Sequence, residues 1–318
     1  MMKTPHTFPP KKINASQGFS LLEFLVASFL SMIVLIAVTS TYFTARTLNT
    51  SASSRLNVQQ DLRNAANLLT RDARMAGSFG CFNMPAYQAN AVLADISENQ
   101  PGLQMVTPGQ TQLSPVKTFE ASAFNTDSFT ADSDDAIVFQ YGIDAGNLAN
   151  IPTNVQTVFS TCSSVTRPTE TLGSTDEVRT ALNLTDNSQD ANISVMRYVA
   201  NAYAIGTSGE KQGLFRFQLN DDGSWSNPQL LVSGITAWNI DRIHVTPDSC
   251  PQAGGANALA IETFDYNNTT LENTTPALIR LSLNHDTGTV EAEEDNTVTV
   301  YHIDATVRGG NTCADRSI

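Results

Sequence analysis

The sequence predicts an α+β protein in which one long N-terminal helix precedes a large, antiparallel β-rich region. An almost entirely apolar run extends from Leu21 to Phe43, and apolar residues at helical spacing continue it to Ala76. After Gly77 the pattern changes to short runs in which apolar and polar side chains alternate. Such alternation is typical of strands that have one covered face.

The N-terminus predicts a single membrane span that is retained in the mature protein. Residues 1–18 form a polar leader with three basic and no acidic side chains, namely Lys3, Lys11 and Lys12. The segment Leu21–Val38 alone has 18 residues, long enough to cross a bilayer and longer than the apolar part of a cleaved secretory signal. By the positive-inside rule, the leader is cytoplasmic and the chain after Phe43 is exported.

The helix is expected to continue well beyond this span, which we place at about residues 19–43. Apolar residues at steps of three and four form one face, namely Val58, Leu62, Ala65, Leu69, Ala73 and Ala76. No proline or glycine interrupts the chain between Phe19 and Gly77, so we predict one helix over 19–77, roughly 87 Å long. The Ser/Thr-rich patch Thr39–Ser54 has weak helix propensity, and there we expect bending or local melting.

Residues 78–318 are predicted to form an exported β-rich head, large enough for one core or two fused lobes. The predicted strands are Ala136–Tyr141, Ile193–Val199, Leu214–Leu219, Ala237–Val245, Ala258–Phe264, Leu278–Leu283 and Thr297–Val307. Asp222–Gly223 and Asp286–Gly288 are expected at hairpin turns.

The charge balance argues against a nucleic-acid partner. The whole chain has 18 basic and 31 acidic residues, and removal of the leader leaves 15 against 31, a net charge of −16. A surface of that sign repels nucleic acid at long range, so none is expected as a partner.

The four cysteines, Cys81, Cys162, Cys250 and Cys313, all lie in the predicted head. An even number of cysteines in an oxidising compartment favours disulfides, with four buried free thiols as the alternative. Four cysteines allow three pairings, of which we favour Cys81–Cys162 with Cys250–Cys313. No C-x-x-C spacing or Cys/His cluster indicates zinc.

The sequence gives no indication of an enzyme or a cofactor, because the G-x-S-x-G, P-loop, G-x-G-x-x-G and H-E-x-x-H motifs are all missing. His244 and His302 fall in predicted strands. The acidic run Asp132, Asp134 and Asp135 lacks the spacing of a calcium-binding EF-hand, so a solvated loop is expected there. Trp225 and Trp238 are expected in the core rather than in a binding site.

Residues 18–27, GFSLLEFLVA, follow a basic leader and carry one carboxylate, Glu23, inside the apolar run. This combination resembles the prepilin signal of type IV pilins. The resemblance implies that a prepilin peptidase cuts between Gly18 and Phe19, that the new amine of Phe19 is methylated, and that Glu23 pairs with an N-terminal amine during filament packing. A carboxylate in a membrane is costly and needs such a cationic partner. An ordinary signal anchor is the alternative.

Residues 71–81, RDARMAGSFGC, resemble the helix end of the PilW family of minor pilins, and the segment Leu230–Val245 resembles that family more loosely. The resemblance implies a type IV pilin-like fold and a minor pilin that primes filament assembly, sits in a tip complex and supports twitching motility and adhesion. It further implies partners: other minor pilins, the major pilin, the inner-membrane assembly platform and a tip adhesin. The head would lie in the periplasm of a Gram-negative cell and later on the surface pilus.

One departure from the pilin pattern is that no proline lies near Ser40, where major pilins usually carry one in the membrane segment. The resemblance therefore implies a minor rather than a bulk subunit. Two alternatives stay open: the large minor pseudopilin of a type II secretion system, and a pilus-borne adhesin whose head binds a ligand.

Overall fold

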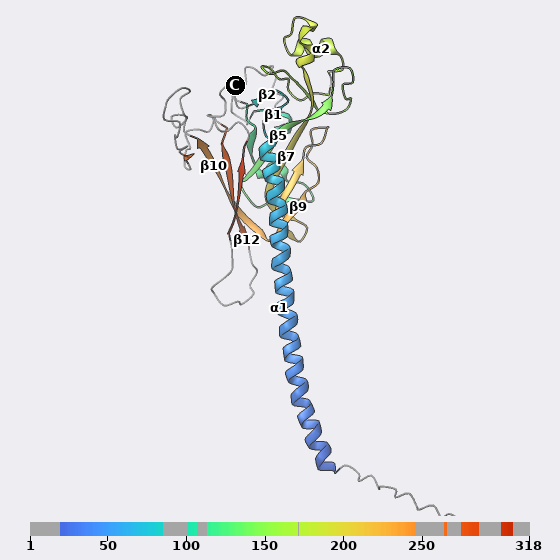
Figure 1. The fold of residues 1–318 in the computed structure, drawn as a ribbon, viewed down its shortest axis with the longest axis vertical. Coiled ribbons are helices and arrows are strands. Elements are labelled where there is room, and N and C mark those ends of the chain that lie inside the picture. The colour runs from blue at the N-terminus through green and yellow to red at the C-terminus, as the bar shows by residue number, and fades with distance from the viewer. Residues whose placement is uncertain are drawn as a thin grey trace, which may run out of the picture. The chain divides into compact units, whose positions relative to one another are not determined.

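The computed structural model describes residues 20–84, 101–106, 113–170, 172–245, 264–265, 275–285 and 300–307. One long helix, α1 (Leu21–Met75), is followed by antiparallel sheets (Figure 1). This is the α+β arrangement that the sequence predicts. The chain divides into two compact units between Asn57 and Val58, so the division falls inside α1 rather than at its end.

The first unit contains α1 up to Asn57, and its side chains are exposed along the whole length. The helix α1 is continuous through Thr39–Ser54, so the local melting expected there is not observed. Hydroxyl groups in this segment donate to the carbonyl four residues earlier, at 2.9–3.1 Å, from Thr41, Thr44, Thr47 and Thr50. These bonds satisfy the threonine hydroxyls within the helix, although the residues have weak helix propensity.

In the second unit, α1 buries the face that the sequence predicts. Its buried apolar residues, together with Ala76 just beyond its end, are Leu62, Ala65, Leu69, Ala73 and Ala76. They pack in one core with residues of two different sheets, among them Phe139 and Leu281. The C-terminal part of α1 is therefore an integral part of the head, which explains why the compact unit begins at Val58.

The larger sheet has seven antiparallel strands. Its main order is β3-β5-β7-β8-β9, and β4 and β6 also pair with the long β7. The strands are β3 (Val116–Glu120), β4 (Thr130–Ala131), β5 (Asp135–Gly146), β6 (Thr157–Ser160), β7 (Ser194–Ser208), β8 (Lys211–Gln218) and β9 (Gln229–Ser233). One face contacts α1, and the other carries a second core rich in phenylalanine.

The smaller sheet has the order β11-β10-β12-β13 and is also antiparallel. Its strands are β10 (Ile235–Val245), β11 (Phe264–Asp265), β12 (Leu278–His285) and β13 (Val300–Thr306). A short hairpin of β1 (Ser78–Phe79) and β2 (Phe82–Asn83) follows α1 directly.

The other helices in the described part of the chain are short. They are α2 (Thr175–Ala181), η3 (Pro101–Leu103), η4 (Ala121–Phe124) and η5 (Asn187–Asn192). A small third core lies beside α2 and contains Phe159, Val178, Leu182 and Val195.

The strand predictions agree with the structure in most places. Ala136–Tyr141 lies within β5, Leu278–Leu283 lies within β12, and Ile193–Val199, Leu214–Leu219, Ala237–Val245 and Thr297–Val307 overlap β7, β8, β10 and β13. The predicted strand Ala258–Phe264 and the predicted turn Asp286–Gly288 lie largely or wholly outside the described residues. At the predicted turn Asp222–Gly223, Gly223 has φ 81°, a conformation that glycine adopts without strain.

Candidate functional site

The start of α1 carries the carboxylate that the sequence singles out. The backbone N–H of Ser20 donates to Glu23 Oε2 at 3.1 Å. Ser20 and Glu23 have the S-x-x-E spacing of a capping box, and this bond is the half in which the third helical residue reaches back. This motif was not predicted, although its spacing can be read from the sequence. Gly18 and Phe19 lie outside the described residues.

By length and composition, α1 contains a candidate membrane span. Its most apolar window of 18 residues has a mean hydropathy of 2.6, and no residue of that window is buried within the protein. The exposed apolar side chains continue from Leu21 to Phe43 with no polar face wide enough to favour water. A helix that is apolar all round needs a membrane or other apolar helices around it.

The end of α1 is joined to the head through a buried carboxylate, Asp72, whose side chain has 0% exposure. Tyr203 Oη donates to Asp72 Oδ2 at 2.7 Å, and Tyr141 Oη donates to Asp72 Oδ1 at 3.0 Å. The guanidinium of Arg216 lies 3.5 Å from Asp72 Oδ2 and is itself almost fully buried. A charge with several partners of this kind fixes the helix at one position on the sheet.

The buried position beside Asp72 changes the pKa values of Tyr141 and Tyr203. Burial, and then the neighbouring negative charge of Asp72, raise the pKa of Tyr141 to about 12. Burial and Asp72 also raise the pKa of Tyr203 well above its usual value. Both hydroxyls therefore stay protonated at physiological pH and act as hydrogen-bond donors to the carboxylate.

The residues that follow α1 make a tight turn back onto the large sheet. Gly77 has φ 75°, and its N–H donates to the carbonyl of Gln140 at 2.8 Å. Gly80 has φ 66°, and a Cβ at that position would lie 2.5 Å from Ser194 Oγ. Both glycines of RDARMAGSFGC are thus required by backbone conformation, and at Gly80 also by lack of space.

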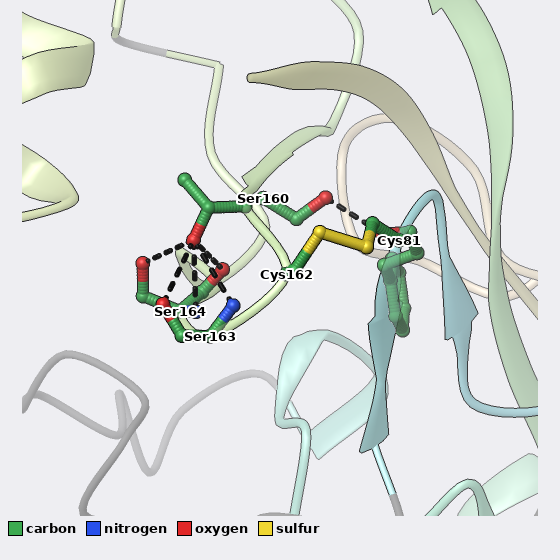
Figure 2. Close-up of a disulfide and its surroundings, with 7 residues drawn as sticks. Cys81, Ser160, Cys162, Ser163 and Ser164 are labelled. Atoms are coloured by element: carbon green, nitrogen blue, oxygen red, sulfur yellow. Dashed lines mark hydrogen bonds between the residues drawn. A yellow bond between two sulfur atoms is a disulfide. The ribbon is translucent and has the colours of Figure 1, made fainter. Parts of the chain in front are cut away.

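A disulfide joins Cys81, in the turn between β1 and β2, to Cys162, just after β6 (Figure 2). This is one of the two pairings favoured from the sequence; Cys250 and Cys313 lie outside the described residues. Both bonded cysteines are exposed. Their turns have further hydrogen bonds: Ser160 Oγ donates to the carbonyl of Phe79 at 2.6 Å, and Thr161 Oγ1 accepts from the Ser164 N–H at 3.0 Å.

A fully buried lysine, which the sequence analysis did not single out, lies in the phenylalanine-rich core. Lys117 has 0% exposure, donates through Nζ to the carbonyl of Gln104 at 2.6 Å, and lies 5.4 Å from the ring centroid of Phe119. Burial lowers the pKa of Lys117 to about 7. In β3 Lys117 alternates with the half-buried residues Val116 and Thr118, so the sequence alone does not show which side of the strand faces the core.

Lys117 is one of three buried side chains that hold the segment 101–106 to the sheet. Tyr198 Oη donates to the carbonyl of Gly102 at 3.0 Å, and Gln140 Nε2 donates to that of Met105 at 3.0 Å. These bonds satisfy backbone carbonyls of a segment that lies outside the main sheet; the Met105 carbonyl also accepts the Ser114 N–H at 3.1 Å. The hydrogen bonds of Lys117, Tyr198 and Gln140 thus have a structural role, which is to hold the segment 101–106 on the sheet.

The other residues singled out in the sequence pack in the core or form hydrogen bonds within the head. Trp225 packs 5.0 Å from Phe124, centroid to centroid, and Trp238 packs against the core around α1. Asp132 accepts hydrogen bonds from Thr207 Oγ1 and Gln212 Nε2. Within the described part of the chain, no three His, Cys, Asp or Glu side chains lie close enough together to hold a metal ion.

A groove of about 760 Å³ lies beside α2. Its charged residues are Arg179, Asp176 and Asp190, and Arg179 donates to both carboxylates. The bonds to Arg179 hold the pKa of Asp190 below its usual value. One guanidinium and two carboxylates leave the groove with a net charge of −1, and all three groups are already paired with one another.

Comparison of the chain with protein-family models, curated proteins and solved structures finds no match. Two features of the chain itself bear on its function: the apolar segment Leu21–Phe43 with its single carboxylate, Glu23, and the junction that fastens α1 to the head.

Proposed function

We propose that this chain is a minor pilin of a type IV pilus, a subunit that primes filament assembly and stays near the filament tip. The observation that carries the proposal is the 55-residue helix α1, whose segment Leu21–Phe43 exposes apolar side chains on every side and contains a single charge, Glu23. Together with the prepilin-like segment GFSLLEFLVA, this helix is suited to two environments in turn, a bilayer and the apolar interior of a filament.

In this proposal Glu23 has a different partner before and after processing. In the full chain its carboxylate accepts the N–H of Ser20. Cleavage between Gly18 and Phe19 would create an amine close to the helix start, and a cationic amine offsets the burial of a carboxylate better than a neutral N–H does. The pairing would therefore form on assembly, when water is excluded.

The junction with the head supports a role in a filament. A subunit held by its helix must transmit force between helix and head, and here the two are fastened by the buried Asp72 cluster and, just after the helix, by the Cys81–Cys162 bond. The net charge of −16 expected for the processed chain disfavours close packing of many identical heads, because like charges repel within a Debye length of about 8–10 Å. A few copies at the tip fit this charge better than a bulk subunit.

The test is deletion of the gene, followed by complementation with the full-length chain. We expect deletion to reduce surface pili and twitching movement sharply while the major pilin stays in the membrane. Quantitative proteomics of sheared filaments from the complemented strain should find this chain far below the major subunit. Normal piliation after deletion would contradict the proposal, and a defect confined to protein secretion would indicate a pseudopilin instead.

A further inference from the structure

The solvent-facing side of α1 within the head is positively charged, unlike the acidic sequence that follows Gly77. We define the arginine face as six exposed residues of α1 spaced three or four apart or adjacent, namely Gln60, Arg63, Asn64, Asn67, Arg71 and Arg74. Residues at such spacings lie on one side of a helix.

The charges of the chain are strongly segregated. From Gly77 to the C-terminus the sequence contains 28 acidic and ten basic residues. Over 58–75 it contains three arginines, and the two acidic residues there are off the arginine face: Asp72 is fully buried and Asp61 is half-buried. The arginine face therefore has a net positive charge on a strongly acidic protein.

The composition of this face is that of an interface rather than of a solvated helix. The segment 58–75 contains no lysine and no glutamate, the residues that usually cover exposed helix surfaces. Arginine is enriched at protein interfaces, where lysine and glutamate are depleted. Asn64 and Asn67 have weak helix propensity, so helix stability alone does not account for them.

Interactions within the chain account for only part of the positive charge on the arginine face. Arg74 lies in the last turn of α1, where a positive charge interacts favourably with the helix dipole. Arg71 lies 3.7 Å from Asp72 but keeps 62% of its side chain exposed. Arg63 is three turns from the helix end, and none of the ion pairs formed by the described residues includes it.

We propose that the arginine face docks onto the acidic head of an adjacent subunit in the pilus or its assembly complex. This inference rests on the proposed function. The favoured occupant is a protein surface with excess Asp and Glu, of which the head of this chain is itself an example. Guanidinium groups bind carboxylates with two parallel hydrogen bonds, which gives such a contact orientation as well as attraction.

The test replaces Arg63 in the full-length chain and measures the amount in sheared filaments relative to the membrane. Arg63→Glu should lower this ratio about tenfold or more, since like charges across an interface cost several kcal/mol. Arg63→Lys keeps the positive charge but loses the two parallel hydrogen bonds, so its ratio should lie between those of the wild type and Arg63→Glu. The matched control is Lys211→Glu, an equal charge reversal at an exposed residue of β8. Formation of the Cys81–Cys162 bond in the membrane fraction reports that each variant is folded.

A second measurement does not depend on a disruptive substitution. A photo-crosslinking residue in place of Asn67, in the middle of the arginine face, should form an adduct with an acidic segment of another filament subunit, identified by peptide mass spectrometry. Equal filament recovery of Arg63→Glu and Lys211→Glu, or adducts with lipid alone, would overturn the inference and leave the proposed function intact. Absence of the wild-type chain from filaments would overturn both.

Discussion

The two parts of α1 belong to one unbroken helix but differ in what surrounds them. Over Leu21–Phe43 the helix exposes apolar side chains on every side, whereas from Val58 it buries one apolar face and exposes a polar one. The hydrophobic pattern thus specifies the surroundings of each part: an external apolar medium for the first, and the head's own core for the second. Substitutions in the first part should change processing and assembly, and those in the second should change folding stability.

The largest effect is expected at the leader junction. Replacing Gly18 by a larger residue should leave only the full-length precursor on an immunoblot, because the resemblance to prepilins implies that the peptidase accepts a residue without a side chain before Phe19. Gly173→Ala is the matched control, since a Cβ at Gly173 would meet nothing within 4 Å. Mature-sized protein in the Gly18 variant would contradict the prepilin interpretation.

Two substitutions of Glu23 distinguish the effect of its charge from its role as a helix cap. Glu23→Gln keeps an oxygen that can accept the Ser20 N–H but removes the charge, and Glu23→Ala removes both. If pairing with an amine drives assembly, both variants should be processed and inserted yet be depleted from filaments about tenfold or more, a loss of at least 1.4 kcal/mol. Filament entry of the Gln variant at the wild-type level would show that only capping matters.

In the second part of α1 the strongest effect on stability is expected at Asp72. Asp72→Ala leaves the buried Arg216 without its carboxylate and two tyrosine hydroxyls without an acceptor. Loss of one partner of a buried ion pair typically costs about 3–5 kcal/mol. Urea unfolding of the full-length protein in detergent measures the change. Asp61→Ala, at a half-buried residue of the same helix, should change stability by only about 0.5 kcal/mol.

Removal of the Cys81–Cys162 bond should have a smaller effect on the head. The bond closes a loop over a sequence separation of 81 residues, for which a stabilisation of about 2–4 kcal/mol is typical. Because both turns keep their own hydrogen bonds, the double Ser variant should fold and lose this stability without losing the antiparallel sheets. Circular dichroism before and during urea unfolding checks both points, and a variant that fails to fold would show that the turns depend on the bond.

The pattern of apolar residues predicted the parts of the fold that depend on local periodicity. The buried face of α1 was readable because Leu62, Leu69 and Ala73 lie at helical spacing. The strand β12 was readable because its side chains alternate, and β5 because it contains a short, continuous apolar run. The short strands β4 and β9 were missed, since they pair with strands whose position only the tertiary fold determines. The arginine face could be identified only once the structure showed which side of α1 is buried.

The polar residues of the junction could not be predicted in the same way. Asp72 lies beside the apolar stripe and is stabilised by Tyr141, Tyr203 and Arg216, which are far from it in sequence. Periodicity reports burial of apolar residues, but it carries no information on which distant partners make burial of a charge possible.

The smallest effect on stability is expected from Lys117, and it can be measured as a dependence of stability on pH. Its pKa is about 7 in the folded protein against 10.5 for an unperturbed lysine, so the unfolded chain binds more protons between pH 7 and 10.5. Stability should therefore rise with pH in this window, by about 1 kcal/mol between pH 7 and 8 from this group. Below pH 7 the cost of the buried charge is present in full.

Urea unfolding of the full-length protein at several pH values measures this slope. Lys117→Met keeps a similar volume and has no charge, so its stability should rise less steeply with pH than that of the wild type. Lys211→Met, at an exposed position, serves as the matched control and should keep the wild-type slope. Identical slopes for the Lys117 and Lys211 variants would show that Lys117 is charged in the folded head and that its carbonyl and aromatic neighbours, Gln104 and Phe119, are sufficient to hold the ammonium group.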